Sequence, residues 1–154
     1  MTPEDKLGEM GLELPEAMAP VANYVPFTRS GNLVHISGQI SKVGADIVTG
    51  RLGEGLSVEE GQRAARLCGL NLLAQMKLAA GGDLAKVRVL KLGGFVQCTA
   101  RAHGPKIPQI INGASDLMVA VLGEHGRHAR AAVSAPALPL DVAVGIDAVI
   151  EVRD

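Results

Sequence analysis

The side chain that most clearly suggests chemistry is Arg130, which follows His128 and opens a run of small residues near the end of the chain. A planar guanidinium offers paired hydrogen-bond donors that match a carboxylate. After Arg130 come Ala, Val, Ser, Pro and Leu, and the next carboxylate along the chain is Asp141. We expect Arg130 to bind the carboxylate of a ligand; the alternative is an arginine that reaches solvent or a carboxylate of another subunit.

The four histidines, His35, His103, His125 and His128, raise the question of a metal site or of acid–base chemistry. His125 and His128 are three residues apart in a glycine-rich stretch that lacks a metal-ligand pattern, so no metal is expected. His128 precedes Arg130 by two residues and is expected beside it. No nucleophile elbow surrounds a serine, no phosphate-binding loop follows a glycine pair, and no cofactor is expected.

The composition limits the class of protein. At 154 residues the chain has the length of one domain, 1–154, and its formal net charge of −1 gives no basic footprint for nucleic acid. Cys68 and Cys98 lie in apolar patterns and are expected to be buried residues of a reducing compartment, not a disulfide. Neither a signal peptide nor a membrane-spanning run is apparent, so a soluble cytoplasmic protein is expected.

Two helices are predicted from patterning. The first begins at Ser57, which forms a capping box with Glu60, and a Gly-Gly pair ends it. The second covers about Pro108–Leu122 and ends before Gly123. Residues 1–20 are polar, with one short helical turn near Pro3–Met10.

Five strands are also predicted. From Val142 to Val152 every even residue is apolar, a period of two that indicates a strand with one buried face. Three other strands are predicted at about Tyr24–Arg29, Leu33–Gln39 and Lys86–Cys98, and a fourth begins at Arg130. Residues 41–55 and 99–106 are expected to be loops. The order ββαβαββ predicts an α+β fold with a mixed sheet and two helices on one face, which leaves the other face to be covered by subunit association.

Four stretches together resemble the YjgF/Rid family of reactive intermediate deaminases: "ANYVPFTRSGNLVHISGQI", the two helices, "INGASDLMVAVLGEHG" and "ARAAVSAPALPLDVAVGIDAVIEV". The match covers roughly residues 20–152 in the family's order. Residues 1–20 form an N-terminal extension, which suggests a longer-chain branch. The resemblance implies a chorismate-mutase-like fold and a homotrimer whose sheets form a barrel, with clefts between subunits.

The resemblance also implies site residues. Arg130 would pair with the carboxylate of a 2-imino or 2-enamino acid, and Tyr24 and Asn112 would complete the catalytic set. Ser37 and Gly38 would bring donors close to the ligand. The alternatives are a half-buried core tyrosine, an asparagine that fixes the local backbone and a serine that closes a turn.

Two positions depart from the family. A cysteine common two residues after the arginine is Ala132 here, but the backbone carbonyl is the group expected to contact substrate. Fifteen residues after the arginine, Gly145 replaces the glutamate that positions the hydrolytic water, so that general base is lost. Asp147 lies on the same strand face and is a candidate substitute through a water; the alternative is a solvent-facing carboxylate.

The resemblance therefore implies hydrolysis of small 2-imino or 2-enamino acids to 2-keto acids and ammonia. Because Gly145 lacks a carboxylate, the alternative is a protein that binds a small carboxylate or keto acid without catalysis. An endoribonuclease activity, attached to some family members, is disfavoured by the charge balance and by the scarcity of aromatic side chains for base stacking.

Overall fold

The computed structural model describes residues 1–17, 19, 22–99 and 101–154 of the chain. The helices and strands follow in the order α1 (Pro3–Glu9), β1 (Phe27–Ser30), β2 (Leu33–Ile40), β3 (Lys42–Val43), β4 (Asp46–Ile47), α2 (Val58–Ala79), β5 (Val87–Gln97), α3 (Ile107–Leu122), β6 (Ala129–Ala135) and β7 (Val144–Val152). Four short 3₁₀ helices connect them: η1 (Leu84–Lys86), η2 (Arg101–Lys106), η3 (Gly123–Gly126) and η4 (Pro139–Asp141).

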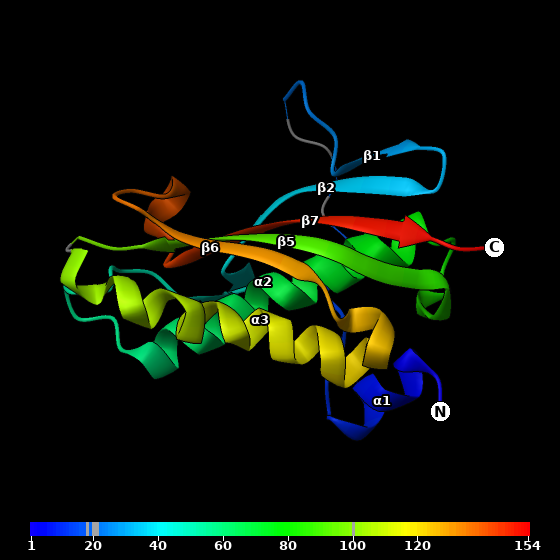
Figure 1. The fold of residues 1–154 in the computed structure, drawn as a ribbon, viewed down its shortest axis with the longest axis horizontal. Helices are drawn as coiled ribbons and strands as arrows, with labels where there is room; N and C mark the ends of the chain where they lie inside the picture. The colour runs from blue at the N-terminus through cyan, green and yellow to red at the C-terminus, as the bar shows by residue number, and fades with distance from the viewer. Residues whose placement is uncertain (18, 20–21, 100) are drawn as a thin grey trace.

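One five-stranded mixed sheet organises the fold (Figure 1). Its strand order is β1-β2-β7-β5-β6, and β5 and β6 are its one parallel pair, as expected for strands joined through a helix. A separate hairpin of β3 and β4 lies in the segment that the sequence predicted as a loop. Its strands are two residues each, too short to give a periodic signal.

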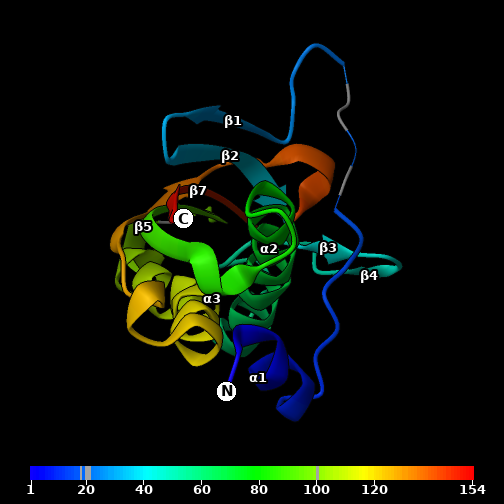
Figure 2. The ribbon, with the colours of Figure 1, turned by 90° about the vertical axis from the view of Figure 1, so that its right-hand side faces the viewer.

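The two long helices cover one face of this sheet, as predicted (Figure 2). The Ser57 hydroxyl accepts from the Glu60 amide at 3.1 Å, which confirms the capping box at the start of α2. Glycines bring α2 and α3 close together: a Cβ at Gly113 would collide with the backbone carbonyl of Gln62, and one at Gly61 would lie 2.7 Å from Ile110. These close contacts set the distance between α2 and α3.

The core lies between the helices and the sheet. Along β7 the even residues from Val144 to Val152 are buried and the odd residues face away, so the predicted period of two is confirmed. Adjacent glycines on β5 serve opposite faces: Gly94 leaves room for Ile111 of α3, and Gly93 leaves room for the Asp147 carboxylate on the other side. We refer below to the helix face and the open face of the sheet.

The N-terminal helix α1 packs against α3. The short helix near Pro3 is confirmed, and its Leu7 is buried against the core. By contrast, the strand predicted from Tyr24 begins only at Phe27, so Tyr24 lies in the preceding loop, 58% exposed. The predicted loop at 99–106 contains η2 instead. Single Pro and Gly residues favoured a loop there but do not exclude a 3₁₀ turn.

Candidate functional site

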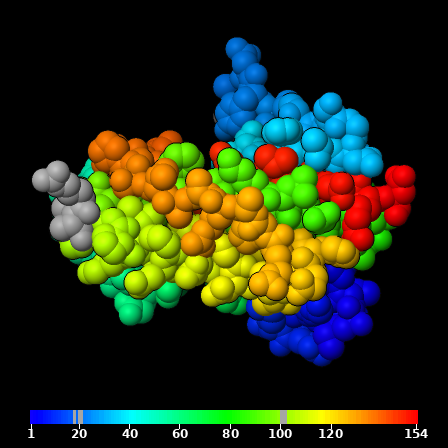
Figure 3. All heavy atoms as spheres, viewed as in Figure 1, coloured from blue at the N-terminus to red at the C-terminus, as the bar shows by residue number. Residues whose placement is uncertain are grey.

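Arg130 lies on β6, which is the edge strand of the sheet and packs beside α3. Figure 3 shows the β6 segment, in orange, alongside the yellow-green to yellow segment of α3. In the parallel register with β5, Arg130 is opposite Leu92, which is fully buried on the helix face. Neighbouring strand residues that are in register point to the same face. The Arg130 side chain is therefore directed toward α3, and it is half-buried.

Two polar side chains of α3 hold the Arg130 guanidinium. Its Nη1 donates to Asn112 Oδ1 at 2.7 Å and to Ser115 Oγ at 3.1 Å. Asn112 and Ser115 are three residues apart and so lie on one face of the helix. Within the described residues no carboxylate reaches ion-pairing distance of Arg130, since the five ion pairs there involve other cations. The Arg130 charge is therefore positioned by neutral groups.

His128 joins the same cluster through Ser115. Its Nε2 lies 2.9 Å from Ser115 Oγ, and its Nδ1 lies 2.6 Å from the backbone oxygen of Gly126. A carbonyl oxygen only accepts, so Nδ1 carries a hydrogen, and in the neutral imidazole Nε2 accepts from the Ser115 hydroxyl. The hydroxyl thus donates to His128 and accepts from Arg130. We call Asn112, Ser115, His128 and Arg130 the arginine cluster.

The arginine cluster lines a shallow hollow of about 310 Å³, together with Val119 and Arg127. Arg127 is largely exposed and lies 3.6 Å from Glu124. None of the hollow's lining residues is acidic, and two carry guanidinium groups, so the local potential favours an anion. Arginine and asparagine donors arranged around an open space are suited to a carboxylate.

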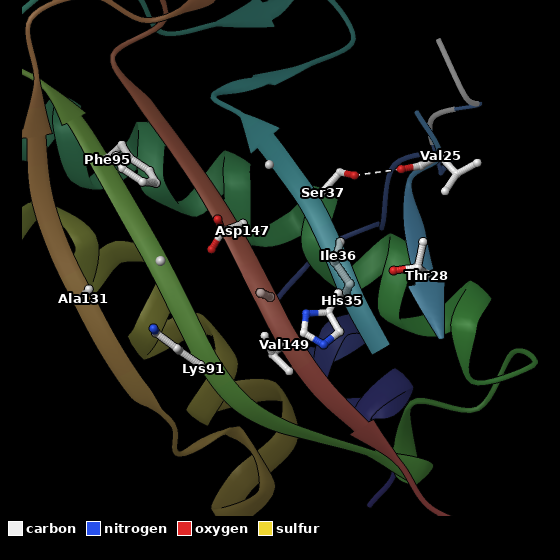
Figure 4. Close-up of a pocket in the computed structure, with 13 residues that line it drawn as sticks. Val25, Thr28, His35, Ile36, Ser37, Lys91, Phe95, Ala131, Asp147 and Val149 are labelled. Atoms are coloured by element: carbon white, nitrogen blue, oxygen red, sulfur yellow. Dashed lines mark hydrogen bonds between the residues drawn. The ribbon is translucent and has the colours of Figure 1, made fainter. Parts of the chain in front are cut away.

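A second, larger hollow of about 490 Å³ lies on the open face of the sheet (Figure 4). On this face, neighbouring strands carry Asp147, Lys91, Phe95 and His35. Ser37 and Gly38 also line the hollow. Asp147 is exposed and leans over Gly93. This hollow contains acid, base and aromatic groups, and it is open along the sheet.

The predicted residues near this second hollow differ in their local roles. The Ser37 hydroxyl donates to the Val25 carbonyl at 2.7 Å, so it anchors the loop before β1. Gly38 lies where the register of β2 against β7 shifts, between Ile36 and Gln39. Tyr24 lines a third hollow of about 340 Å³ that includes Ser37 and Gly38. Tyr24, Ser37 and Gly38 are therefore brought together.

Within one subunit the predicted site residues form two groups on opposite faces of the sheet. Arg130, Ala132 and Asn112 belong to the helix face and its edge. Gly145 and Asp147 belong to the open face, as do Ser37 and Gly38. That all of them share one cleft stays a prediction, which requires residues of a second subunit.

Sequence reasoning did not find Ser115. The available signal was its position three residues after Asn112 on the predicted helix, which places both on one face. His128 was placed near Arg130 from its spacing, but its bond to Ser115 depends on how η3 turns the chain.

Other chemical features are sparse in the described part of the chain. Cys68 and Cys98 are buried and form no disulfide, and burial raises the pKa of the Cys68 thiol well above its ordinary value. Among the described residues, no set of three or more His, Cys, Asp or Glu is arranged to hold a metal. No helix in that part of the chain is long and apolar enough to span a membrane.

Comparisons with known proteins agree with this architecture. The curated protein TCP17 of Trypanosoma cruzi is 46% identical over 152 residues, covering 96% of this chain and 92% of TCP17. The crystal structure of Atu1372 from Agrobacterium tumefaciens, described as a protein of unknown function, is 49% identical, with a TM-score of 0.89 over 98% of this chain and 92% of that one.

A more distant solved structure is that of Escherichia coli TdcF with bound serine. It is 25% identical, with a TM-score of 0.55, and the alignment covers 90% of this chain and 94% of TdcF. The family model described as "YjgF/chorismate_mutase-like, putative endoribonuclease" matches residues 4–151. The chain therefore belongs to the YjgF/chorismate-mutase-like family.

Proposed function

We propose that the protein is a homotrimeric enamine/imine deaminase that hydrolyses small 2-imino or 2-enamino acids to 2-keto acids and ammonia. The observation that carries the proposal is the half-buried Arg130, held by Asn112 and Ser115 in a hollow without an acidic lining residue. A ligand carboxylate would supply the missing counter-ion through two parallel hydrogen bonds. TdcF, with its bound serine, shows that one relative takes a small molecule that bears a carboxylate.

The open face supports the proposed trimer. Phe95 is 39% exposed and Val133 is 46% exposed there, on adjacent strands in register. Apolar side chains on a sheet face are usually covered by another layer, which a second and third copy of the chain would provide. Contact of one copy's open face with a neighbour's edge strand would also bring Asp147 or Tyr24 toward Arg130.

In the proposed reaction, Arg130 binds the substrate carboxylate and places the adjacent imine carbon beside the backbone carbonyl of Ala132. A water adds to that carbon, and loss of ammonia then leaves the 2-keto acid. Enamines and imines hydrolyse in water without help, so orientation and charge placement are sufficient for a modest acceleration.

Gly145 favours one alternative, a protein that binds small carboxylates without turning them over. No carboxylate stands at this position to activate water. A Cβ built at Gly145 meets only the Gln39 carbonyl oxygen, at 3.8 Å, so a glutamate can be introduced there without a clash of its Cβ. An RNA-cleaving activity is not proposed, because the net charge is −1 and the chain has three aromatic Phe and Tyr residues in all.

A coupled assay tests the proposal. An amino-acid oxidase generates 2-imino acids, and semicarbazide traps whatever survives hydrolysis. Wild type is expected to lower the yield of semicarbazone, whereas Arg130→Ala is expected to leave it unchanged. Activity in Gly145→Glu alone would support the binding protein, and inactivity of wild type and both variants would reject the deaminase.

A further inference from the structure

We propose that Ser115 and His128 form the proton-transfer couple of the arginine cluster, an inference that rests on the proposed deaminase function. None of the residues that line the hollow around Arg130 is acidic, so the proposed hydrolysis needs another group that takes a proton from water. The Ser115 hydroxyl and the His128 imidazole supply one next to Arg130, within a single chain.

The geometry of the couple is that of a relay. The Ser115 hydroxyl donates to His128 Nε2 at 2.9 Å, and the opposite ring nitrogen donates to the Gly126 carbonyl at 2.6 Å. A hydroxyl bonded to a base that is oriented by a third group is the recurrent arrangement for proton transfer. Both side chains line the hollow where the substrate would lie.

The orienting carbonyl is fixed by the backbone. A Cβ at Gly126 would collide with the Met118 carbonyl oxygen, so η3 sits directly against the end of α3 only because residue 126 is a glycine. Ser115 lies on α3 and His128 follows η3 at the start of β6. The close approach therefore sets the distance between the two side chains.

Arg130 supports the couple from the other side. Its Nη1 donates to Ser115 Oγ at 3.1 Å, which stabilises negative charge on that oxygen while its proton moves to His128. Asn112 accepts the shorter bond from the same nitrogen, at 2.7 Å, and so holds the guanidinium without Ser115. Positioning of Arg130 and transfer of a proton are thus assigned to different residues.

In the first step, water attacks the carbon of the iminium substrate. The C–O bond forms and the electron pair of the C=N bond moves to nitrogen, while a proton of the water passes to Ser115 and the Ser115 proton passes to His128. In the second step the imidazolium returns a proton through Ser115 to the amine. The C–N bond breaks, the hydroxyl proton goes to the departing ammonia, and a 2-keto acid and ammonium result.

The test uses the full chain with Ser115→Ala and His128→Gln in the coupled assay, read out as separate kcat and KM values. Both variants are expected to lower kcat by about 100-fold, a typical contribution of a general base, with KM changed less than threefold. Ser115→Thr, which keeps the hydroxyl, should recover most of the activity. Calorimetric binding of pyruvate should persist in both variants and be lost in Arg130→Ala.

The matched control is His125→Gln, three residues from His128 but exposed and bonded to Arg153. It should retain wild-type kcat. Unchanged kcat in folded His128→Gln or Ser115→Ala would overturn the couple while leaving the deaminase standing. So would a parallel loss of pyruvate binding, which would show that the pair merely holds Arg130. An inactive wild type would overturn both proposals.

Discussion

The two faces of the five-stranded sheet are built from the same strands yet differ in how complete they are. On the helix face, Val144, Ile146 and Ile150 are fully buried, and α2 packs against their strand, β7. On the open face, the alternate residues of the same strand include an exposed Asp147 and a half-exposed Val149. The helix face is a finished core, whereas the open face carries apolar and charged groups together.

This difference indicates that the two faces of the sheet have different roles. Close packing on the helix face fixes α3 and so positions Asn112 and Ser115 against Arg130. The open face has no helix packed on it in the described part of the chain and leaves Phe95 partly exposed. We therefore expect mutations on the helix face to act on folding, and those on the open face to act on assembly.

The largest effect is expected where the helix face admits no extra atom. A Cβ at Gly113 would collide with the Gln62 carbonyl, so the α2 and α3 backbones would have to separate. Gly113→Ala should lower the free energy of unfolding by about 3 kcal/mol, the upper range for overpacking. Urea unfolding followed by circular dichroism measures this.

Gly38→Ala on the open face is the matched control. Apart from chain neighbours, no atom of the described residues lies within 4 Å of a Cβ built there. Its free energy of unfolding should stay within about 0.5 kcal/mol of wild type. Equal losses in the two variants would contradict the difference in packing between the faces.

The next effect concerns assembly. Phe95→Glu places a charge in the middle of the open face, where burial against another copy would require its costly desolvation. Sedimentation velocity should show a trimer for wild type and a monomer for Phe95→Glu. Leu78→Glu, at an exposed apolar position on α2, should remain a trimer. A wild-type monomer, or a trimeric Phe95→Glu, would remove the proposed role of the open face.

A smaller effect is expected for ligand binding at the arginine cluster. Arg130→Lys keeps the charge but loses the fork that donates two parallel hydrogen bonds. Pyruvate affinity should fall by about 10-fold, as for the loss of one hydrogen bond to a charged group. Arg127→Lys in the same hollow should change it less than twofold, because Arg127 is exposed and beside Glu124. Similar losses in both variants would mean that net charge alone attracts the ligand.

Much of the helix face could be predicted from sequence, because burial under a helix imposes a period. The alternation at Val144–Val152 and the capping box at Ser57 are local signals, and both are confirmed. The sequence predicted a strand from Tyr24, but Tyr24 lies in a loop, and Ser37 bonds to the Val25 and Pro26 carbonyls that follow it. Such long-range bonds leave no trace in local composition.

Only the part of the site that has a local sequence signal could be predicted. Arg130 is recognisable because its neighbours are small and uncharged, and the ion pairs among the described residues involve other cations. Ser115 and His128 meet because η3 packs against Met118 through Gly126, which is a tertiary contact. The share of the open face in the cleft stays a prediction, since it depends on a neighbouring subunit.

The smallest effect is the pH dependence of stability that arises from the buried Cys68 thiol on the helix face. Burial raises the pKa of this thiol above its ordinary value of 9.0, because desolvation disfavours the thiolate. The folded state thus keeps the thiol protonated, and stability is fully present below pH 9 and is lost as the unfolded chain ionises above it. At pH 10 wild type should lose about 1.4 kcal/mol more, relative to pH 7, than Cys68→Ala. If the free energy of unfolding changed equally for the two proteins between pH 7 and 10, water would reach the thiol. The helix face would then be less tightly closed than the burial of Cys68 indicates.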